Sequence, residues 1–264
     1  MPRFKLLIEY AGTRYSGWQI QTNARTVQGE IARAVREVSR RKDFELYGSG
    51  RTDAGVHALA QVAHLDLYTR FGAEILRRRI NDELPADIHV RAAEPAPHRF
   101  HARHDAVART YLYQISRRRT AFGKPFVWWI REPLDLDAMR AVAAAFVGLK
   151  DFAAMTDDDP GEKSTRVLVE RLELVEAGAL VLIRIRGSHF LWKMVRRIVG
   201  VLAAVGRGEL APADAARLLD DGEGGSRGVT AASLTAPAAG LFLEAVLYEG
   251  DPGPGPVRPI LTIE

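Results

Sequence analysis

An order of strands and helices that occurs twice is the feature that most constrains how this chain of 264 residues can fold. In the first half, Ile31, Ala34, Val35 and Val38 have the spacing of one helix face. This half reads β-α-β-β-α-β, the order of a ferredoxin-like or RRM-like unit. Its strands are predicted at residues 4–10, 44–47, 61–67 and 88–93, and its helices over residues 72–84 and from Thr26, the predicted N-cap.

The second half repeats this order with few identical letters. Met139, Val142 and Phe146 share one helix face, and a longer apolar stripe runs from Leu191 to Leu202. Strands are predicted at residues 109–116, 167–175, 180–186 and 241–248, and helices at residues 137–149, 190–205 and 212–220. We therefore expect an α+β fold of two ferredoxin/RRM-like units, joined into one extended, mainly antiparallel sheet with helices on one face.

Stretches without periodicity divide the chain. The segment EPAPHRFHARH, residues 94–104, separates a predicted N-terminal RRM-like unit over residues 1–104 from a C-terminal one over residues 105–250. Residues 251–264 form a Pro/Gly-rich tail that is not expected to pack as a helix or strand. The acidic loop DDDPGEK, residues 157–163, is expected to be mobile.

Composition limits the chemistry and the partners. The chain has no cysteine, which excludes disulfides, thiolate nucleophiles and cysteine-ligated metals. Of its 37 cationic residues 31 are arginine, which favours phosphate recognition, although the codon bias of a GC-rich genome explains the same excess. No apolar run approaches the ~18 residues of a membrane span. The first twelve residues read as a strand and not as a signal peptide, so we expect a cytoplasmic protein without a membrane partner.

Two single residues stand out as candidates for chemistry. Asp53 lies in GSGRTDAGVHA, residues 48–58, between glycines that allow close approach of a bulky substrate. It is either a carboxylate nucleophile or base, or an Asp that hydrogen-bonds its own turn. Arg196, near the start of an apolar helix, is a candidate ion-pair partner for this carboxylate, or else a solvent-facing arginine.

Aromatic and histidine residues give weaker signals. Strand alternation places Arg109, Tyr111 and Tyr113 on one face, as a base-stacking platform or as an aromatic cross-strand cluster. The segment HRFHARH, residues 98–104, carries three histidines outside any regular pattern. That context favours contact with phosphate over a metal site, and we predict no metal.

Taken together, these pieces resemble one family, the TruA-type tRNA pseudouridine synthases. The resemblance begins with GRTDAGVHA and extends over residues 4–248, with the family's motifs in order. The other motifs are EYAGTRYSGWQIQ at 9–21, RTVQGE at 25–30, FHARHDA at 100–106, RTYLY at 109–113, FLWKMVRRIVG at 190–200 and APAAGLFLEAVLY at 236–248.

The resemblance implies an enzyme that converts uridine to pseudouridine in tRNA, usually at positions 38, 39 and 40 of the anticodon stem-loop. It implies no cofactor and no metal. Asp53 matches the essential aspartate, which attacks the nucleotide or takes a ribose proton. Arg196 matches the arginine that pairs with the aspartate, Tyr111 the tyrosine that stacks on the target base, and Arg51 an arginine linked to flipping that base out of the helix.

The resemblance also implies a homodimer whose tRNA spans both subunits. Eight further residues match RNA contacts of the family: Phe100, His101, Ala102, Arg103, His104, Ser164, Thr165 and Arg166. The chain departs from the family at His189 and at the bulky Trp192. The acidic residues 157–159 are unexpected so near the proposed RNA contact at 164–166.

Other classes of protein compete with the enzyme. The main alternative is a non-catalytic RNA-binding protein of two RRM-like units, in which Asp53 only shapes a turn. The strand QVAHLDL at 61–67 lacks the aromatics that such proteins display, which counts against this alternative. A structural protein whose arginines reflect codon bias is the third, and it predicts no salt-dependent RNA binding.

Overall fold

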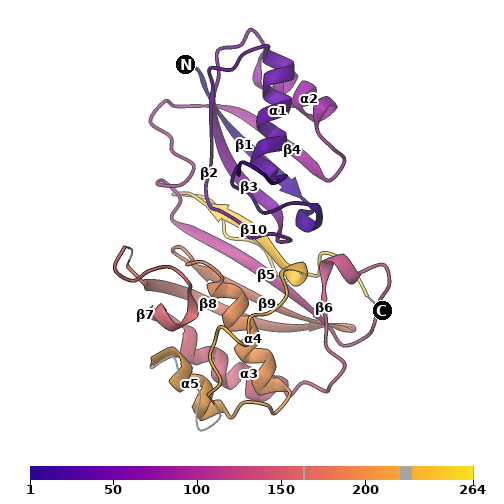
Figure 1. The fold of residues 1–264 in the computed structure, drawn as a ribbon, viewed down its shortest axis with the longest axis vertical. Helices are drawn as coiled ribbons and strands as arrows, with labels where there is room; N and C mark the ends of the chain where they lie inside the picture. The colour runs from indigo at the N-terminus through magenta and orange to yellow at the C-terminus, as the bar shows by residue number, and fades with distance from the viewer. Residues whose placement is uncertain (163, 221–227, 264) are drawn as a thin grey trace. The chain divides into compact units, whose positions relative to one another are not determined.

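The chain folds into two compact units. A computed structural model describes residues 1–162, 164–220 and 228–263 (Figure 1). The first unit comprises Met1–Val107 with Phe242–Gly253, and the second comprises Ala108–Leu241 with Pro254–Glu264. Residues 242–253 join the first unit because β10 (Leu241–Leu247) runs parallel to β3 (His57–Asp66), with Phe242 opposite His57 and Leu243 opposite Ala58.

The first unit has the predicted ferredoxin-like order. Strand β1 pairs antiparallel with both β3 and β4, and β2 pairs antiparallel with β3. Helices α1 and α2 pack beside one another on one side of this sheet (Figure 1). The elements are β1 (Arg3–Tyr10), α1 (Val27–Ser39), β2 (Glu45–Gly48), β3, α2 (Ala73–Glu83), β4 (Ile88–Ala96) and β10.

Local sequence explains these elements. Alternate residues of β1 are buried, including Leu6 and Ile8, which are both 0% exposed. Thr26 is the N-cap of α1, as predicted, and its Oγ1 accepts a hydrogen bond from the Gly29 amide at 3.2 Å. The helix ends at Arg40, whose φ of 57° is left-handed.

The second unit has a four-stranded antiparallel sheet in the order β5-β9-β8-β7, with the short β6 parallel to β5. Helices α3 and α4 pack against one another. The elements are β5 (Ala108–Ser116), β6 (Trp128–Trp129), α3 (Leu136–Ala143), β7 (Gly148–Asp151), β8 (Arg166–Ala177), β9 (Leu180–Gly187), α4 (Met194–Gly206) and α5 (Pro212–Asp220). The α+β class and the mainly antiparallel pairing are confirmed.

Two predicted helices of this unit are shorter than expected. The helix predicted at residues 137–149 ends at Ala143, and after one 3₁₀ turn the chain becomes edge strand β7. Gly148, with φ of 107°, makes this change of direction. The helix predicted at residues 190–205 begins only at Met194, because Lys193 has a left-handed φ of 62°.

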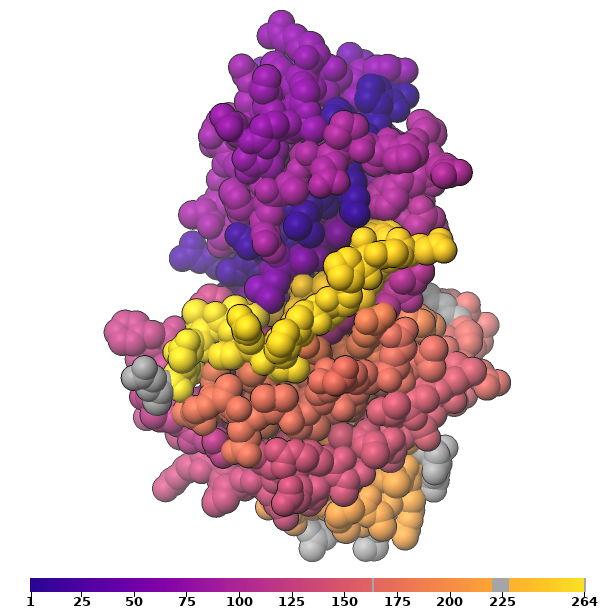
Figure 2. All heavy atoms as spheres, turned by 180° about the vertical axis from the view of Figure 1, so that it is seen from behind, coloured from indigo at the N-terminus to yellow at the C-terminus, as the bar shows by residue number. Residues whose placement is uncertain are grey.

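The C-terminal tail has no helix or strand among its described residues, yet it packs against the second unit. Ile263 is 5% exposed and lies in an apolar cluster with Leu112 and Leu182. The Ile260 amide donates to Gln114 Oε1 at 2.7 Å. Figure 2 shows yellow atoms from the end of the chain beside the orange atoms of this unit.

In the described ranges, no helix is both long enough and apolar enough to cross a bilayer.

Candidate active site

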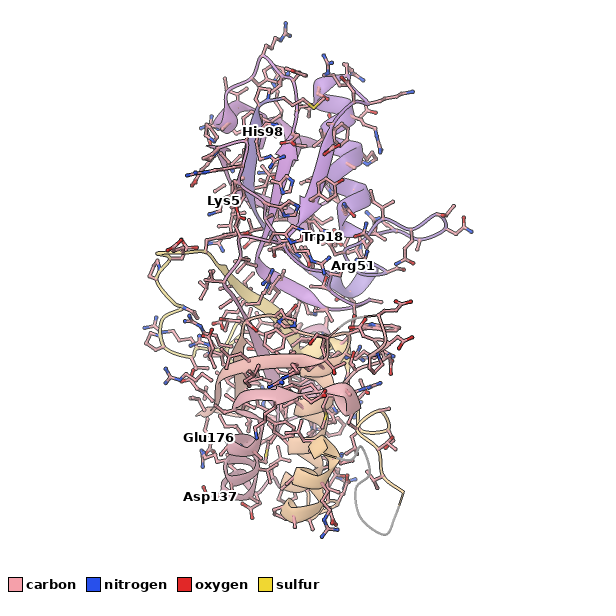
Figure 3. The ribbon with its side chains drawn as sticks, turned by 90° about the vertical axis from the view of Figure 1, so that its left-hand side faces the viewer. Lys5, Trp18, Arg51, His98, Asp137 and Glu176 are labelled. Carbon is pink, nitrogen blue, oxygen red and sulfur yellow. The ribbon has the colours of Figure 1, made fainter. Side chains whose placement is uncertain are left out.

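Asp53 lies in the connection between β2 and β3 of the first unit. It is half-buried, and its carbonyl oxygen accepts a hydrogen bond from the Val56 amide at 3.2 Å. Arg51, two residues earlier, is exposed; Figure 3 labels it near Trp18. The loop therefore presents a carboxylate and a guanidinium from one short, irregular segment.

The beginning of this loop is clamped by Gln61, which is completely buried in β3. The side-chain amide of Gln61 donates to the Gly50 carbonyl at 2.9 Å, and its oxygen accepts from Ser49 Oγ at 2.9 Å. The Ser49 amide donates to the Val62 carbonyl at 2.8 Å. Because Ser49 and Gln61 are buried, their side chains depend on one another in place of water.

The segment after β1 holds the centre of the loop. Tyr10 Oη and Thr52 Oγ1 share a hydrogen bond of 2.8 Å, and the Trp18 amide donates to the Thr52 carbonyl at 3.1 Å. The Gly55 amide donates to the Tyr15 carbonyl at 3.3 Å. Burial raises the pKa of Tyr10 to about 12, so its phenol stays protonated. Backbone and side chains on both sides of Asp53 are thus fixed.

Two glycines of this segment touch the backbone of the loop directly. A Cβ on Gly17 would lie 2.4 Å from the Thr52 carbonyl oxygen, and Gly17 has φ of 89°. A Cβ on Gly12 would lie 1.9 Å from the Val56 carbonyl oxygen. Only glycine allows these contacts. The sequence analysis assigned no role to these supporting residues; glycines among aromatics in EYAGTRYSGW were the available signal.

Tyr111 and Tyr113 in β5 of the second unit differ in exposure. Tyr113 is 0% exposed, and its hydroxyl donates to the Pro237 carbonyl at 2.7 Å. Burial raises the pKa of Tyr113. Tyr111 is half-buried and meets the Phe190 ring edge to face, with the centroids 5.2 Å apart. Of the two tyrosines, only Tyr111 is therefore partly exposed.

Arg196 lies in the first turn of α4 and is half-buried. Its Nε donates to the Ala236 carbonyl at 2.8 Å, and its own carbonyl accepts from the Ala236 amide at 3.0 Å. Gly200 allows the chain before Ala236 to run against α4, because a Cβ there would lie 1.6 Å from the Leu234 carbonyl oxygen. Hydrogen bonds with the backbone of Ala236 thus fix the Nε end of the Arg196 guanidinium.

The predicted RNA-contact segment 100–104 is anchored through its middle residue. Ala102 is 0% exposed; its amide donates to His64 Nδ1 at 3.2 Å, and its carbonyl accepts from the Tyr248 hydroxyl at 2.7 Å. Arg103 and His104, in the turn that begins at Ala102, are exposed. Ala102 thus supports the segment, while the two residues after it face solvent.

Arg3 fastens the start of the same segment. Its guanidinium forms a bidentate pair with Asp66, at 2.6 and 2.5 Å, and donates to the carbonyls of His98 and Phe100 at 2.7 and 2.6 Å. Lys5 Nζ lies 5.6 Å from the centroid of the Phe100 ring. Figure 3 shows Lys5 and His98 on the side of this unit away from its helices.

Two histidines accept backbone hydrogen bonds in this segment. His101 Nδ1 accepts from the amides of Arg103 and His104, at 3.1 and 3.2 Å. Burial lowers the pKa of His101, and it lowers that of His64 to about 4. Both rings are therefore neutral near pH 7. Over the part of the chain that the structure describes, no three His, Asp or Glu residues form a group able to hold a metal ion.

The second predicted RNA-contact segment, residues 164–166, belongs to the second unit. Thr165 is 6% exposed, and its hydroxyl donates to Asp151 Oδ1 at 2.6 Å. Ser164 and Arg166 are exposed. Thr165 therefore anchors this segment as Ala102 anchors the other, and its two neighbours remain accessible.

Comparison with known proteins assigns the family. A family model described as tRNA pseudouridine synthase matches residues 6–105 and 142–249. A protein of Citrifermentans bemidjiense named tRNA pseudouridine synthase A is 42% identical over 94% of this chain and 98% of its own length. Proteins of the same name from Geobacter sp. strain M21 and Rhodopseudomonas palustris strain BisB18 are 41% and 42% identical, over 94% of this chain and 99% and 100% of their own lengths. The chain belongs to the tRNA pseudouridine synthase family and is an isomerase that forms pseudouridine in tRNA.

Proposed function

We propose that this enzyme modifies uridines 38, 39 and 40 in the anticodon stem-loop of tRNA, with Asp53 as its nucleophile or base. The fixed loop around Asp53 is the observation that carries the proposal. Buried hydrogen bonds of Gln61 and Tyr10 and the close approach of Gly17 hold that loop, while Asp53 itself is half-buried. Such preorganisation is what a group needs to meet a reacting atom in one geometry.

The reaction is an isomerisation, so its atoms balance without a co-reactant. Asp53 attacks the nucleotide or takes a ribose proton, and the bond between N1 and C1′ breaks. The uracil turns and C5 bonds to C1′, while the bond between Asp53 and the nucleotide breaks or the ribose regains its proton. The proton on C5 then leaves to water, and N1 gains a proton. Product and substrate have the same formula. We propose that Arg196 keeps the Asp53 carboxylate ionised during these steps.

The target uracil must leave the stem before Asp53 can act. Extrusion costs a few kcal/mol of stacking and pairing. We propose that Arg51 helps to fill the vacated position and to hold phosphate, and that Tyr111 recovers stacking on the flipped base. The half-buried Tyr111 ring, supported at its side by Phe190, is consistent with that role.

The remaining RNA contacts are proposed at the two anchored segments. In the first, Phe100, His101, Arg103 and His104 surround the buried Ala102; in the second, Ser164 and Arg166 flank the buried Thr165. We further propose a cytoplasmic homodimer whose tRNA contacts both subunits.

The test is release of tritium from C5 of uridine in unmodified tRNA, with tRNA binding measured in parallel. We expect release by the wild type and none by Asp53→Asn, which still binds. Asp43→Asn, an exposed carboxylate paired with Arg41, removes the same charge and should leave release unchanged. Release by Asp53→Asn at the wild-type rate would overturn the role of Asp53. Binding of tRNA without tritium release, by the wild type as well as by both variants, would favour the non-catalytic RNA-binding protein.

Transcripts with single uridines at positions 38, 39 or 40 test the target site. We expect each to release tritium, and a transcript without uridine at all three to release none. Release from the latter would contradict the proposed positions while leaving the family's activity intact.

A further inference from the structure

The acidic loop DDDPGEK, expected to be mobile, is tied to the start of α4. Asp157 pairs through Oδ2 with Lys193 Nζ at 2.7 Å and through Oδ1 with the Arg197 guanidinium. Asp158 Oδ2 accepts a hydrogen bond from the Trp192 amide at 3.0 Å. We call Asp157 and Asp158 the acidic clasp. The two adjacent carboxylates, which the sequence analysis left unexplained, thus have partners at the start of α4.

The clasp neutralises a buried cation. The Arg197 side chain is only 4% exposed, and among the described residues its Nε has no hydrogen-bond partner. Asp157 is the carboxylate that it meets. A buried guanidinium is costly unless paired, so the loop and the helix are held together more firmly than by a surface ion pair. The carboxylates also lie at the N-terminal end of α4, where the helix dipole favours negative charge.

The chain bends sharply where the clasp binds. Lys193, the residue before α4, has a left-handed φ of 62°, which non-glycine residues rarely adopt. The Arg197 amide donates to the Lys193 carbonyl at 3.0 Å, so the first turn of the helix begins directly from this bend. Asp157 holds the Lys193 side chain, and Asp158 holds the preceding amide. The clasp therefore stabilises an unfavourable conformation that sets where α4 starts.

Arg196 lies within this turn, between Lys193 and Arg197. Its backbone and Nε are held by Ala236, while its neighbours are held by the clasp. We propose that Asp157 is a positioning residue that acts through the first turn of α4 to set the place of the Arg196 guanidinium, an inference that rests on the proposed role of Arg196.

This proposal predicts different effects of Asp157 on the rate of the chemical step and on the affinity for tRNA. Asp157 neutralises Lys193 and Arg197, so removing its charge leaves the surface more cationic and, by charge alone, favours tRNA binding. Losing the position of Arg196 lowers the rate of the chemical step instead. A variant without the carboxylate should therefore bind tRNA at least as tightly as the wild type and react more slowly.

The experiment compares Asp157→Asn with Asp159→Asn in full-length enzyme. Asp159 lies in the same loop, and its Oδ1 accepts a hydrogen bond from the Gly161 amide at 2.8 Å, within the loop itself. Tritium release is measured in single turnover with enzyme in excess, alongside the Kd for tRNA. We expect the rate of Asp157→Asn to fall about tenfold or more, since small displacements of a reacting group have such effects. Asp159→Asn should stay within about twofold of wild type.

The single variant Lys193→Gln covers the case in which Asp157→Asn does not fold, and the double variant adds a test where both single variants fold. Lys193→Gln removes one arm of the clasp and keeps the pair with Arg197, and it should slow release several-fold. Adding Lys193→Gln to Asp157→Asn should cause little further loss, because both act through one contact. Independent, additive losses would overturn the proposal, as would equal effects of Asp157→Asn and Asp159→Asn or a loss confined to tRNA affinity.

Arg196→Gln distinguishes failure of this inference from failure of the proposed function. If Arg196→Gln releases tritium at the wild-type rate, the role of Arg196 is wrong and the inference falls with it. If Arg196→Gln is inactive while Asp157→Asn and Lys193→Gln react normally, the role of Arg196 stands and only the clasp is rejected.

Discussion

The Asp53 loop of the first unit and the Arg196 turn of the second are held by different forces. The Asp53 loop is fixed by buried, uncharged hydrogen bonds and by glycines in contact with its backbone. The Arg196 turn has hydrogen bonds with Ala236 and, in addition, the ion pairs of the acidic clasp, of which the one between Asp157 and Lys193 is about one-third exposed on both partners. A reactive group can thus be positioned by packing alone or with the help of charge.

The difference has a physical consequence. Uncharged buried hydrogen bonds respond little to salt, and removing one partner leaves an unsatisfied group in the interior. Ion pairs at the surface are screened by salt and depend on the ionisation of both partners. We therefore expect the first region to fail through loss of volume or partners, and the second through changes of ionic strength or extreme pH.

The largest effect is expected from Gly17→Ala. The new Cβ would meet the Thr52 carbonyl oxygen at 2.4 Å, and alanine disfavours the φ of 89°. We expect the free energy of unfolding to fall by about 2–4 kcal/mol and tritium release to drop to background. Gly72→Ala is the matched control, because a Cβ there meets nothing within 4 Å. Wild-type release by Gly17→Ala would show that the loop is not held by packing.

The next effect is a difference in pH response. Burial holds the pKa of His64 at about 4, below its ordinary 6.5. Between these values the unfolded chain binds a proton that the folded chain does not, so stability is complete above pH 6.5 and falls towards pH 4. The slope is at most about 1.4 kcal/mol per pH unit. Urea unfolding from pH 7 to pH 4 should show this slope, and His64→Gln should remove it.

The acidic clasp should lose its stabilising effect only at a lower pH than the His64 contact. The hydrogen bond from Lys193 lowers the pKa of Asp157 below its ordinary 3.8, so this stabilisation is complete above pH 3.8 and is lost only as pH falls further. Hydrogen exchange at pH 5 should therefore show weaker protection of the Ala102 amide with α4 still protected. Equal loss of protection at the Ala102 amide and in α4 at pH 5 would contradict the different pKa shifts of His64 and Asp157. His104→Gln, at an exposed histidine, is the control for His64→Gln. It should leave the slope of the unfolding free energy between pH 7 and pH 4 unchanged.

A moderate effect is expected from Gln61→Leu. Leucine leaves the Gly50 carbonyl and Ser49 hydroxyl without their partners, which should cost about 1–3 kcal/mol of unfolding free energy and slow release. Urea unfolding and single-turnover release measure both. Gln21→Leu, whose side chain makes an exposed hydrogen bond to the Ser16 carbonyl, should change neither. An equal effect of the two variants would remove the distinction between buried and exposed support.

The smallest effect is expected from salt. Raising ionic strength from about 0.05 to 0.5 M shortens the Debye length to about 4 Å and screens the pair between Asp157 and Lys193. A loss of about 0.5–1 kcal/mol should speed exchange of the α4 first-turn amides a few-fold. The Val56 and Gly55 amides of the Asp53 loop should be unaffected. Greater salt sensitivity in the Asp53 loop would reverse the comparison.

Much of the fold followed from local patterns. The alternation in β1, the apolar face of α1 and its N-cap at Thr26 are written within a few consecutive residues, and the structure confirms them. The predicted C-terminus of α3 and the predicted N-terminus of α4 were wrong, because residues with apolar helical spacing extend beyond each observed helix. There Gly148 and Lys193 adopt left-handed conformations, and the residues after Gly148 pair with β8.

The candidate site divides in the same way. The motif around Asp53 marks that residue in the sequence, and its role, with those of Arg51, Tyr111 and Arg196, stays a prediction. What holds these residues was not readable, because each support joins residues far apart in the chain: Trp18 with Thr52, Arg196 with Ala236, Asp157 with Arg197. Tyr113 matched the same strand pattern as Tyr111, and only packing showed that it is buried.

The sequence by itself therefore determined the order of elements in the first unit, the α+β class and the loop that carries Asp53. Periodicity and capping act over a few residues, so they can be read without the fold. Tertiary structure decided that β10 pairs with β3, that Gly17 must be glycine and that the acidic loop binds α4. These outcomes depend on which surfaces meet, and a single sequence does not state the contacts of residues that only folding brings together.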